Sequence, residues 1–140
     1  MKALSIRHPW VEAILAGDKT IEIRSWATRH RGELLLHASR TWTKREKEAV
    51  EQVRALGLDA GRPAPERTGA ILGKARLVDC RLMTDADWPQ ALLEPRSGRL
   101  WAWELAAAEP LPAPVPLAGE RTLFEVDDAL VSKAGRRKRS

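Results

Sequence analysis

We expect the fold of this chain to be organised around the stretch Gly17-Asp18-Lys19-Thr20-Ile21-Glu22-Ile23-Arg24-Ser25-Trp26. Gly17 can adopt a positive φ and so end a helix. From Thr20 onward polar and apolar side chains alternate, which predicts a strand with Ile21 and Ile23 facing the core. The opposite face then carries a single row of side chains, Thr20, Glu22, Arg24 and Trp26, with Lys19 at its entrance.

The row of polar side chains has two interpretations. A half-exposed sheet commonly shows polar residues to water, and Glu22 beside Arg24 would then be a surface ion pair that adds little stability. Alternatively, the row is a binding or catalytic face. A tryptophan continues the row and a basic tract follows it directly, and both features favour a functional face.

The basic residues are unevenly distributed along the chain. The formal net charge is +5, and residues 133–139 alone contribute five positive charges. Residues 19–45 carry a net charge of +5 and residues 46–132 a net charge of −5. A basic district on an otherwise balanced body favours a local anionic partner. We expect residues 133–140 to form a disordered basic tail, because they are too charged to pack.

Length and composition predict one globular domain over residues 1–132. The chain has 140 residues, of which 44% are hydrophobic and 31% charged, values typical of a soluble protein. No apolar run is long enough to cross a bilayer and no signal-peptide pattern opens the chain, so we expect a cytoplasmic protein without membrane contact. The single cysteine, Cys80, excludes an internal disulfide and has no Cys or His neighbours at metal-ligand spacing. We therefore expect no metal and no cofactor. The oligomeric state is left open, with a monomer favoured.

Local patterns predict more strands than helices. Strands are expected at residues 2–7, 20–26, 32–39, 70–82, 99–105 and 123–126, and helices at residues 9–16, 44–56, 84–88 and 127–132. Thr43 and Glu46 match a capping box at the start of the second helix. Pro89 is expected to break the third helix. Four prolines between residues 110 and 116 are expected to enforce an extended connection. The pattern predicts an α+β fold, most simply a small mixed β-barrel with two or three flanking helices.

The candidate chemistry lies in basic residues interleaved with tryptophans. The sequence contains no P-loop, no dinucleotide fingerprint, no nucleophile elbow and no zinc-protease motif, so it gives no support for those activities. Cations that meet phosphates and indoles that stack on bases are typical of single-stranded nucleic-acid binding. Trp10 and Trp103 are expected in the core. His37, at the end of a buried strand and near the hydroxyl of Ser39, is kept as a candidate although such histidines are more often structural.

Several motifs resemble the ASCH domain family. They are Ala3-Leu4-Ser5-Ile6, His8-Pro9-Trp10, residues 17–24, residues 31–39 and Trp101-Ala102-Trp103-Glu104-Leu105, which together span about residues 2–110. The G-x-K-x-x-E-x-R core of residues 17–24 is the most specific of these motifs. His8 stands where glutamine is commoner in the family.

The resemblance implies a PUA-like β-barrel with a cleft that contains Lys19, Glu22 and Arg24, and a role connected with RNA. Some small bacterial members are enzymes, among them an amidohydrolase acting on N4-acetylcytidine and a ribonuclease. In the amidohydrolase group a lysine that matches Lys19 acts with a threonine, and here Glu22 occupies the place of that threonine.

Our main hypothesis is a module that binds single-stranded or modified RNA, or a modified nucleoside. Its candidate binding residues are Lys19, Arg24, Trp26, Arg29, Arg31, His37, Ser39 and Arg40. The alternative is a small metal-independent hydrolase of RNA or a nucleoside in which Lys19 and Glu22 are catalytic. Arg24 would lower the pKa of Lys19 and Glu22 would raise it, and the sequence leaves both outcomes open. A third hypothesis is a protein-interaction module whose basic tail binds acidic partners.

Overall fold

The structure, a computed structural model, describes residues 1–132. Its strands are β1 (Lys2–Ile6), β2 (Ile21–Arg24), β3 (Gly32–Ala38), β4 (Ala70–Leu82), β5 (Trp101–Pro116) and β6 (Phe124–Glu125). Its helices are α1 (Trp10–Leu15), α2 (Lys44–Ala55) and α3 (Trp88–Ala91), with 3₁₀ turns η1 (Pro65–Arg67) and η2 (Asp85–Asp87) and a further helical turn at residues 128–132. The expected basic tail, residues 133–140, lies outside the described residues.

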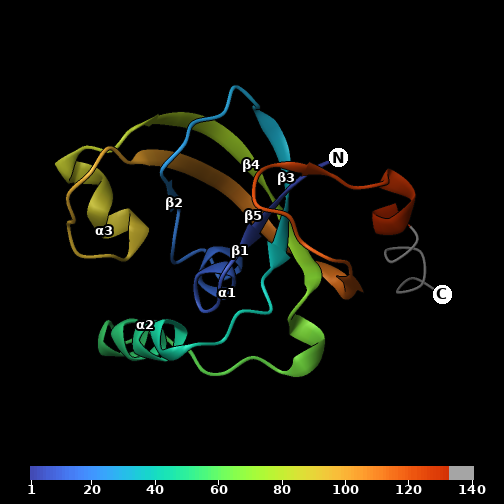
Figure 1. Cartoon of the computed structure of the whole chain (residues 1–140), viewed down its shortest axis with the longest axis horizontal. Coiled ribbons are helices and arrows are strands. Elements are labelled where there is room, and N and C mark those ends of the chain that lie inside the picture. The colour runs from blue at the N-terminus through green and yellow to red at the C-terminus, as the bar shows by residue number, and fades with distance from the viewer. Residues whose placement is uncertain (133–140) are drawn as a thin grey trace.

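One six-stranded sheet, in the order β2-β5-β4-β3-β1-β6, forms the body of the molecule (Figure 1). All neighbouring strands run antiparallel except β1 and β3, which are parallel. Within residues 1–132 the two edge strands, β2 and β6, do not pair with each other, so the sheet is open. The α+β class is confirmed, whereas the closed barrel is not.

The sheet curves strongly, as shown by a contact between two strands that are far apart in the strand order. Three strands separate β2 from β1, yet the guanidinium of Arg24 on β2 donates to the backbone oxygen of Ser5 on β1 at 2.8 Å. Helix α1 packs its apolar side, Val11 and Ile14, into the main core against β3 and β5. Gly73 on β4 makes this packing possible, because a side chain there would collide with Leu15.

The strand predicted from residue 20 is β2, and its isoleucines are buried as expected. Strand β2 pairs with β5, which places Glu22 opposite Trp103. Trp103 is fully buried in the main core, as predicted, and its indole N–H donates to the backbone oxygen of Trp26 at 3.2 Å. This bond ties Trp26, two residues after the end of β2, to the core.

Two proline-based predictions were wrong. The segment rich in prolines continues β5 and pairs with β4 through Val115 and Pro116. Beyond residue 106 β5 has a partner on one side only, and an edge tolerates residues that lack an N–H donor. Pro89 lies in the first turn of α3 and does not break it, because proline suits the first helical turn. No helix among residues 1–132 is long and apolar enough to span a membrane.

Candidate nucleic-acid interface

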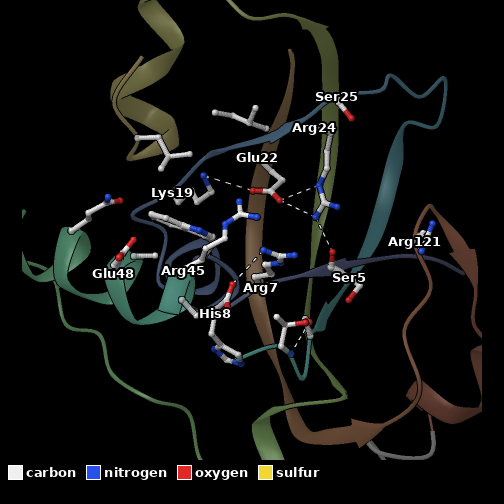
Figure 2. A pocket seen from close by; sticks show the side chains of 18 of the residues that line it. Ser5, Arg7, His8, Lys19, Glu22, Arg24, Ser25, Arg45, Glu48 and Arg121 are labelled. Carbon is white, nitrogen blue, oxygen red and sulfur yellow. Dashed lines mark hydrogen bonds and ion pairs between the residues drawn. The ribbon is translucent and has the colours of Figure 1, made fainter. Parts of the chain in front are cut away.

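A cavity of about 790 Å³ opens between α1, β2 and the start of α2 (Figure 2). Of the sequence-predicted site residues, it is lined by Lys19, Glu22, Arg24, Trp26 and Ser39. The cavity is also lined by Ser5, Arg7, Trp10, Ser25, Arg45, Arg96 and Arg121. The cavity therefore gathers side chains from two parts of the chain, residues 5–52 and 93–121.

Lys19 forms the buried floor of this cavity and is only 1% exposed. Its ammonium donates to the backbone oxygen of Ala91 at 2.6 Å and lies 3.7 Å from a carboxylate oxygen of Glu22. It also lies 5.0 Å from the ring centre of Trp10, a distance at which a cation is attracted to an indole. Helix α1 ends at Leu15, shortly before Lys19, and the backbone N–H of Lys19 donates to the backbone oxygen of Ala13 in that helix.

Burial lowers the pKa of Lys19, because a desolvated ammonium is less stable than a hydrated one. The negative charge of Glu22 raises the same pKa but does not cancel the effect of burial. The positive charges of Arg96 and Arg24 lower it further. Of the two charges considered from the sequence, Glu22 has the larger effect on the pKa of Lys19 and Arg24 the smaller, and burial causes the net lowering.

Glu22 is held between two cations. Arg24 donates from Nε and Nη2 to one oxygen of Glu22, at 3.1 and 2.9 Å, while Lys19 faces the other oxygen. The same Nη2 of Arg24 donates to Ser5, so both partners are fixed before any ligand arrives. A carboxylate and a guanidinium fixed in this way can present an acceptor and donors to a polar ligand.

Arginines surround the mouth of the cavity. Arg7 pairs with Glu46 at 3.4 Å. Arg45, Arg96 and Arg121 are exposed and have no ion-pair partner within residues 1–132. Arg7, Arg96 and Arg121 were not predicted from the sequence, because Arg7 directly follows β1 and the other two lie on loops remote from residues 19–45. Only Arg45 carried a local signal, its place in the basic tract.

Two tryptophans provide the aromatic surface of the cavity. Trp10 packs partly against the main core, as expected, and also lines the cavity. Trp26 is half buried and stands edge-on to Trp103, with ring centres 4.8 Å apart. Both indoles therefore have one side fixed by the protein and another available at the cavity.

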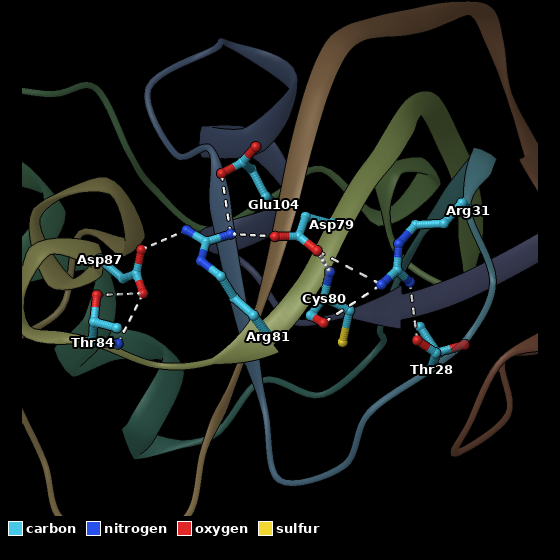
Figure 3. Close-up of polar contacts among 8 residues, drawn as sticks. All are labelled: Thr28, Arg31, Asp79, Cys80, Arg81, Thr84, Asp87 and Glu104. Carbon is cyan, nitrogen blue, oxygen red and sulfur yellow. Dashed lines mark hydrogen bonds and ion pairs between the residues drawn. The ribbon is translucent and has the colours of Figure 1, made fainter.

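The other sequence-predicted residues lie outside this cavity. Arg29 and Arg40 are exposed. Arg31 donates to the backbone oxygen of Thr28 at 3.0 Å and lies 3.7 Å from Asp79. Figure 3 shows Arg31 at one end of a polar network that continues through Asp79 to Arg81.

Two buried histidines lie close to the cavity. His37 is 1% exposed and contacts the Ser5 hydroxyl, and Ser39, the hydroxyl expected beside it, bonds instead to Thr41. His8 lines the cavity, and its Nε2 donates to the backbone oxygen of Arg67 at 2.8 Å. Burial lowers the pKa of both histidines. Both rings are thereby favoured in the neutral form.

Residues 1–132 contain no cluster of carboxylate, histidine and cysteine side chains that could hold a metal ion.

Comparison with known proteins gives one family. The model of the ASCH domain matches residues 4–113. Activating signal cointegrator 1 of Homo sapiens is 35% identical, and that of Mus musculus 34%, over 82 residues that cover 55% of this chain. The chain spans only 14% of the length of these curated relatives.

Solved structures show the same fold. The crystal structure of ASCH from Zymomonas mobilis superposes with a TM-score of 0.63 at 15% identity, covering 94% of this chain and 91% of that one. A tyrosine-to-phenylalanine mutant of that protein gives the same TM-score and identity, with 94% of each chain covered. At this identity the likeness concerns the fold alone.

Proposed function

This chain belongs to the ASCH domain family, and on that premise we propose that residues 1–132 form one domain that binds single-stranded or modified RNA in the cavity containing Lys19, Glu22 and Arg24. The family expected from the motif of residues 17–24 is thereby confirmed. The observation that carries the proposal is the arrangement of the cavity, where a fixed polar floor lies beneath two indoles and arginines that have no ion-pair partner among the described residues.

The arginines at the mouth fit a phosphate-bearing ligand. Guanidinium groups bind phosphate oxygens through paired N–H donors, and Arg45, Arg96 and Arg121 have these donors available within the described residues. Glu48 and Glu120 also line the cavity, so the positive charge is concentrated at particular points of its surface. This pattern suits defined phosphate contacts along a single strand.

The floor and the indoles fit a base. Trp10 and Trp26 offer faces or edges for stacking. Glu22 can accept from an exocyclic amine, and Arg24 can donate to a carbonyl oxygen, which are the contacts that read the edge of an unpaired base. A nucleotide with its base inside and its phosphate at the mouth would use both sets of residues.

We expect Arg45→Ala and Arg121→Ala each to weaken binding of a labelled single-stranded RNA oligomer measured by fluorescence anisotropy. Each substitution should make the slope of log affinity against log salt shallower by about 0.7 to 1, since one phosphate contact is lost. Arg76→Ala is the matched control, because Arg76 is an exposed arginine on β4 outside the cavity. An equal loss in all three variants would show that binding depends on total charge and would refute the proposed site.

A second candidate function is the hydrolase, and the lowered pKa of Lys19 favours it. A neutral amine beside Glu22 could act as a general base towards RNA or an acylated nucleoside without a metal ion. Substitution of Lys19 by arginine separates this activity from binding.

A further inference from the structure

Ser5, which lines the cavity, forms a hydrogen-bonded pair with the buried His37. The two residues lie directly opposite each other in the parallel ladder of β1 and β3, so the backbone places their side chains on the same face. His37 Nδ1 and Ser5 Oγ are 3.0 Å apart, and His37 Nε2 is 2.6 Å from the backbone oxygen of Leu117. Neither Lys19 nor Glu22 takes part in this contact.

The partners determine where the protons lie. A backbone oxygen can only accept, so Nε2 of His37 carries the ring proton and donates it to Leu117. In the neutral ring Nδ1 is then an acceptor, and Ser5 Oγ donates to it. A hydroxyl, a neutral imidazole as base and a third group that orients the imidazole are the components of an activated serine nucleophile.

The surroundings of Ser5 suit an acyl-transfer reaction. Ser5 is half buried and lines the cavity, so a substrate in the cavity can reach its side chain. Arg24 donates to the backbone oxygen of Ser5, so a guanidinium lies beside this residue and can attract a negatively charged substrate. Arg121, two residues after Gly119, adds a second cation to the cavity.

Gly119 covers the pair from the loop that follows β5. A Cβ atom at this position would lie 2.6 Å from His37 Cε1 and 3.0 Å from Ser5 Oγ, so the backbone approaches the pair as closely as a glycine allows. The approach fixes the imidazole ring and limits the access of water from that side.

We propose that Ser5 is a nucleophile and His37 its general base for hydrolysis of carboxylic oxygen esters that carry a negative charge. Ser5 Oγ bonds to the carbonyl carbon as its proton passes to His37 Nδ1. The bond to the leaving alcohol oxygen breaks, and His37 returns the proton to that oxygen. Water then attacks the acyl-serine, its proton passes to His37 and on to Ser5 Oγ as the acyl bond breaks, and a carboxylic acid leaves. The reaction consumes one ester and one water and yields one alcohol and one acid.

The charge preference follows from the arginines. Arg24, Arg96 and Arg121 line the cavity that an ester must enter, so an ester with a carboxylate or phosphate group should bind better than a neutral one. This activity is independent of RNA binding, and its test contains no RNA.

The test uses the full-length protein and a fluorophosphonate probe, followed by peptide mapping. We expect the probe to label Ser5. Ser25 also lines the cavity and is more exposed, but no histidine within residues 1–132 hydrogen-bonds to it, so it should stay unlabelled. Labelling of Ser25 in preference to Ser5, or no labelling at all, would overturn the proposal without any variant.

Hydrolysis of p-nitrophenyl acetate and of the p-nitrophenyl monoester of succinate tests the same pair. Ser5→Ala should abolish release of nitrophenol, and His37→Asn should lower its rate about 100-fold or more, the usual contribution of a general base. Ser132→Ala, at an exposed serine outside the cavity, should leave it unchanged, and the succinate ester should react faster than the acetate. If His37→Asn does not fold by circular dichroism, His37→Gln replaces it. Hydrolysis that persists in Ser5→Ala, or equal rates for the two esters, would refute the proposal.

Discussion

At the scale of the residue, Lys19 is a buried lysine whose ammonium is held by a backbone oxygen from a distant part of the chain. Its place in the motif predicted a part in the site, and it lies in the cavity. Its burial was not predicted, because lysine is rarely buried and the carbonyl oxygen that binds it belongs to Ala91, 72 residues away. The same holds for His37, whose partner Ser5 comes from another strand. A sequence pattern identifies such residues but not their distant partners.

Lys19→Arg separates binding from hydrolysis. Arginine keeps a positive charge but does not lose a proton near neutral pH, so it can anchor a ligand and cannot act as a base. We expect the variant to retain most of its affinity for RNA and the wild type to show no Lys19-dependent turnover of RNA oligomers or acylated cytidine. Product formation is measured by chromatography.

Two controls accompany this substitution. Lys19 is buried, so thermal melting must show that arginine fits, and Lys19→Met serves for the turnover assay if it does not. Glu22→Gln tests the carboxylate. Robust wild-type turnover that both Lys19 variants and Glu22→Gln abolish would establish the hydrolase and contradict binding as the sole function.

At the scale of the element, the start of α2 matches its sequence prediction. Thr43 caps the helix, and Glu46 accepts from the backbone N–H of Thr43 at 2.6 Å, which completes the capping box. This succeeded because a capping box is a contact between residues three apart. The strand after residue 106 was missed, because its pairing with β4 is set by residues more than 30 positions earlier.

Glu46→Gln should change how the stability of the domain depends on pH. Burial opposes ionisation of Glu46, but hydrogen bonds from Thr43 and the charge of Arg7 outweigh it and lower the pKa below its usual 4.5. The carboxylate therefore stabilises the fold above about pH 4.5, and this contribution is lost as the pH falls through the lowered pKa. Glutamine can still fill the capping box.

We expect the wild type to be more stable than Glu46→Gln by about 1 kcal/mol at pH 7. The difference should vanish at low pH, as measured by urea unfolding across the pH range. A difference that does not change with pH would show that Glu46 acts through packing and not through its charge.

At the scale of the whole molecule, the α+β class and most strands followed from local patterns, whereas the curvature of the sheet did not. That curvature brings Arg24 to Ser5 and creates the cavity. Arg96 and Arg121 reach the cavity on loops that carry no recognisable pattern. The motif residues of the site were therefore predictable, and the arginines at its mouth were not.

The two-residue strand β6 has a consequence for how copies of this molecule meet one another. Strand β6 covers the outer edge of β1 by pairing with Lys2 and Ala3. The side chain of Phe124, a residue of β6, is buried. An uncovered strand offers unpaired backbone groups to another chain. We expect Phe124→Asp to release β6 and cause concentration-dependent aggregation, measured by light scattering, whereas Leu130→Asp on the exposed helical turn should stay dispersed. A monodisperse Phe124→Asp protein would show that the edge of β1 is protected by other means. If the variant aggregates, the two residues of β6, Phe124 and Glu125, are what keeps neighbouring molecules apart.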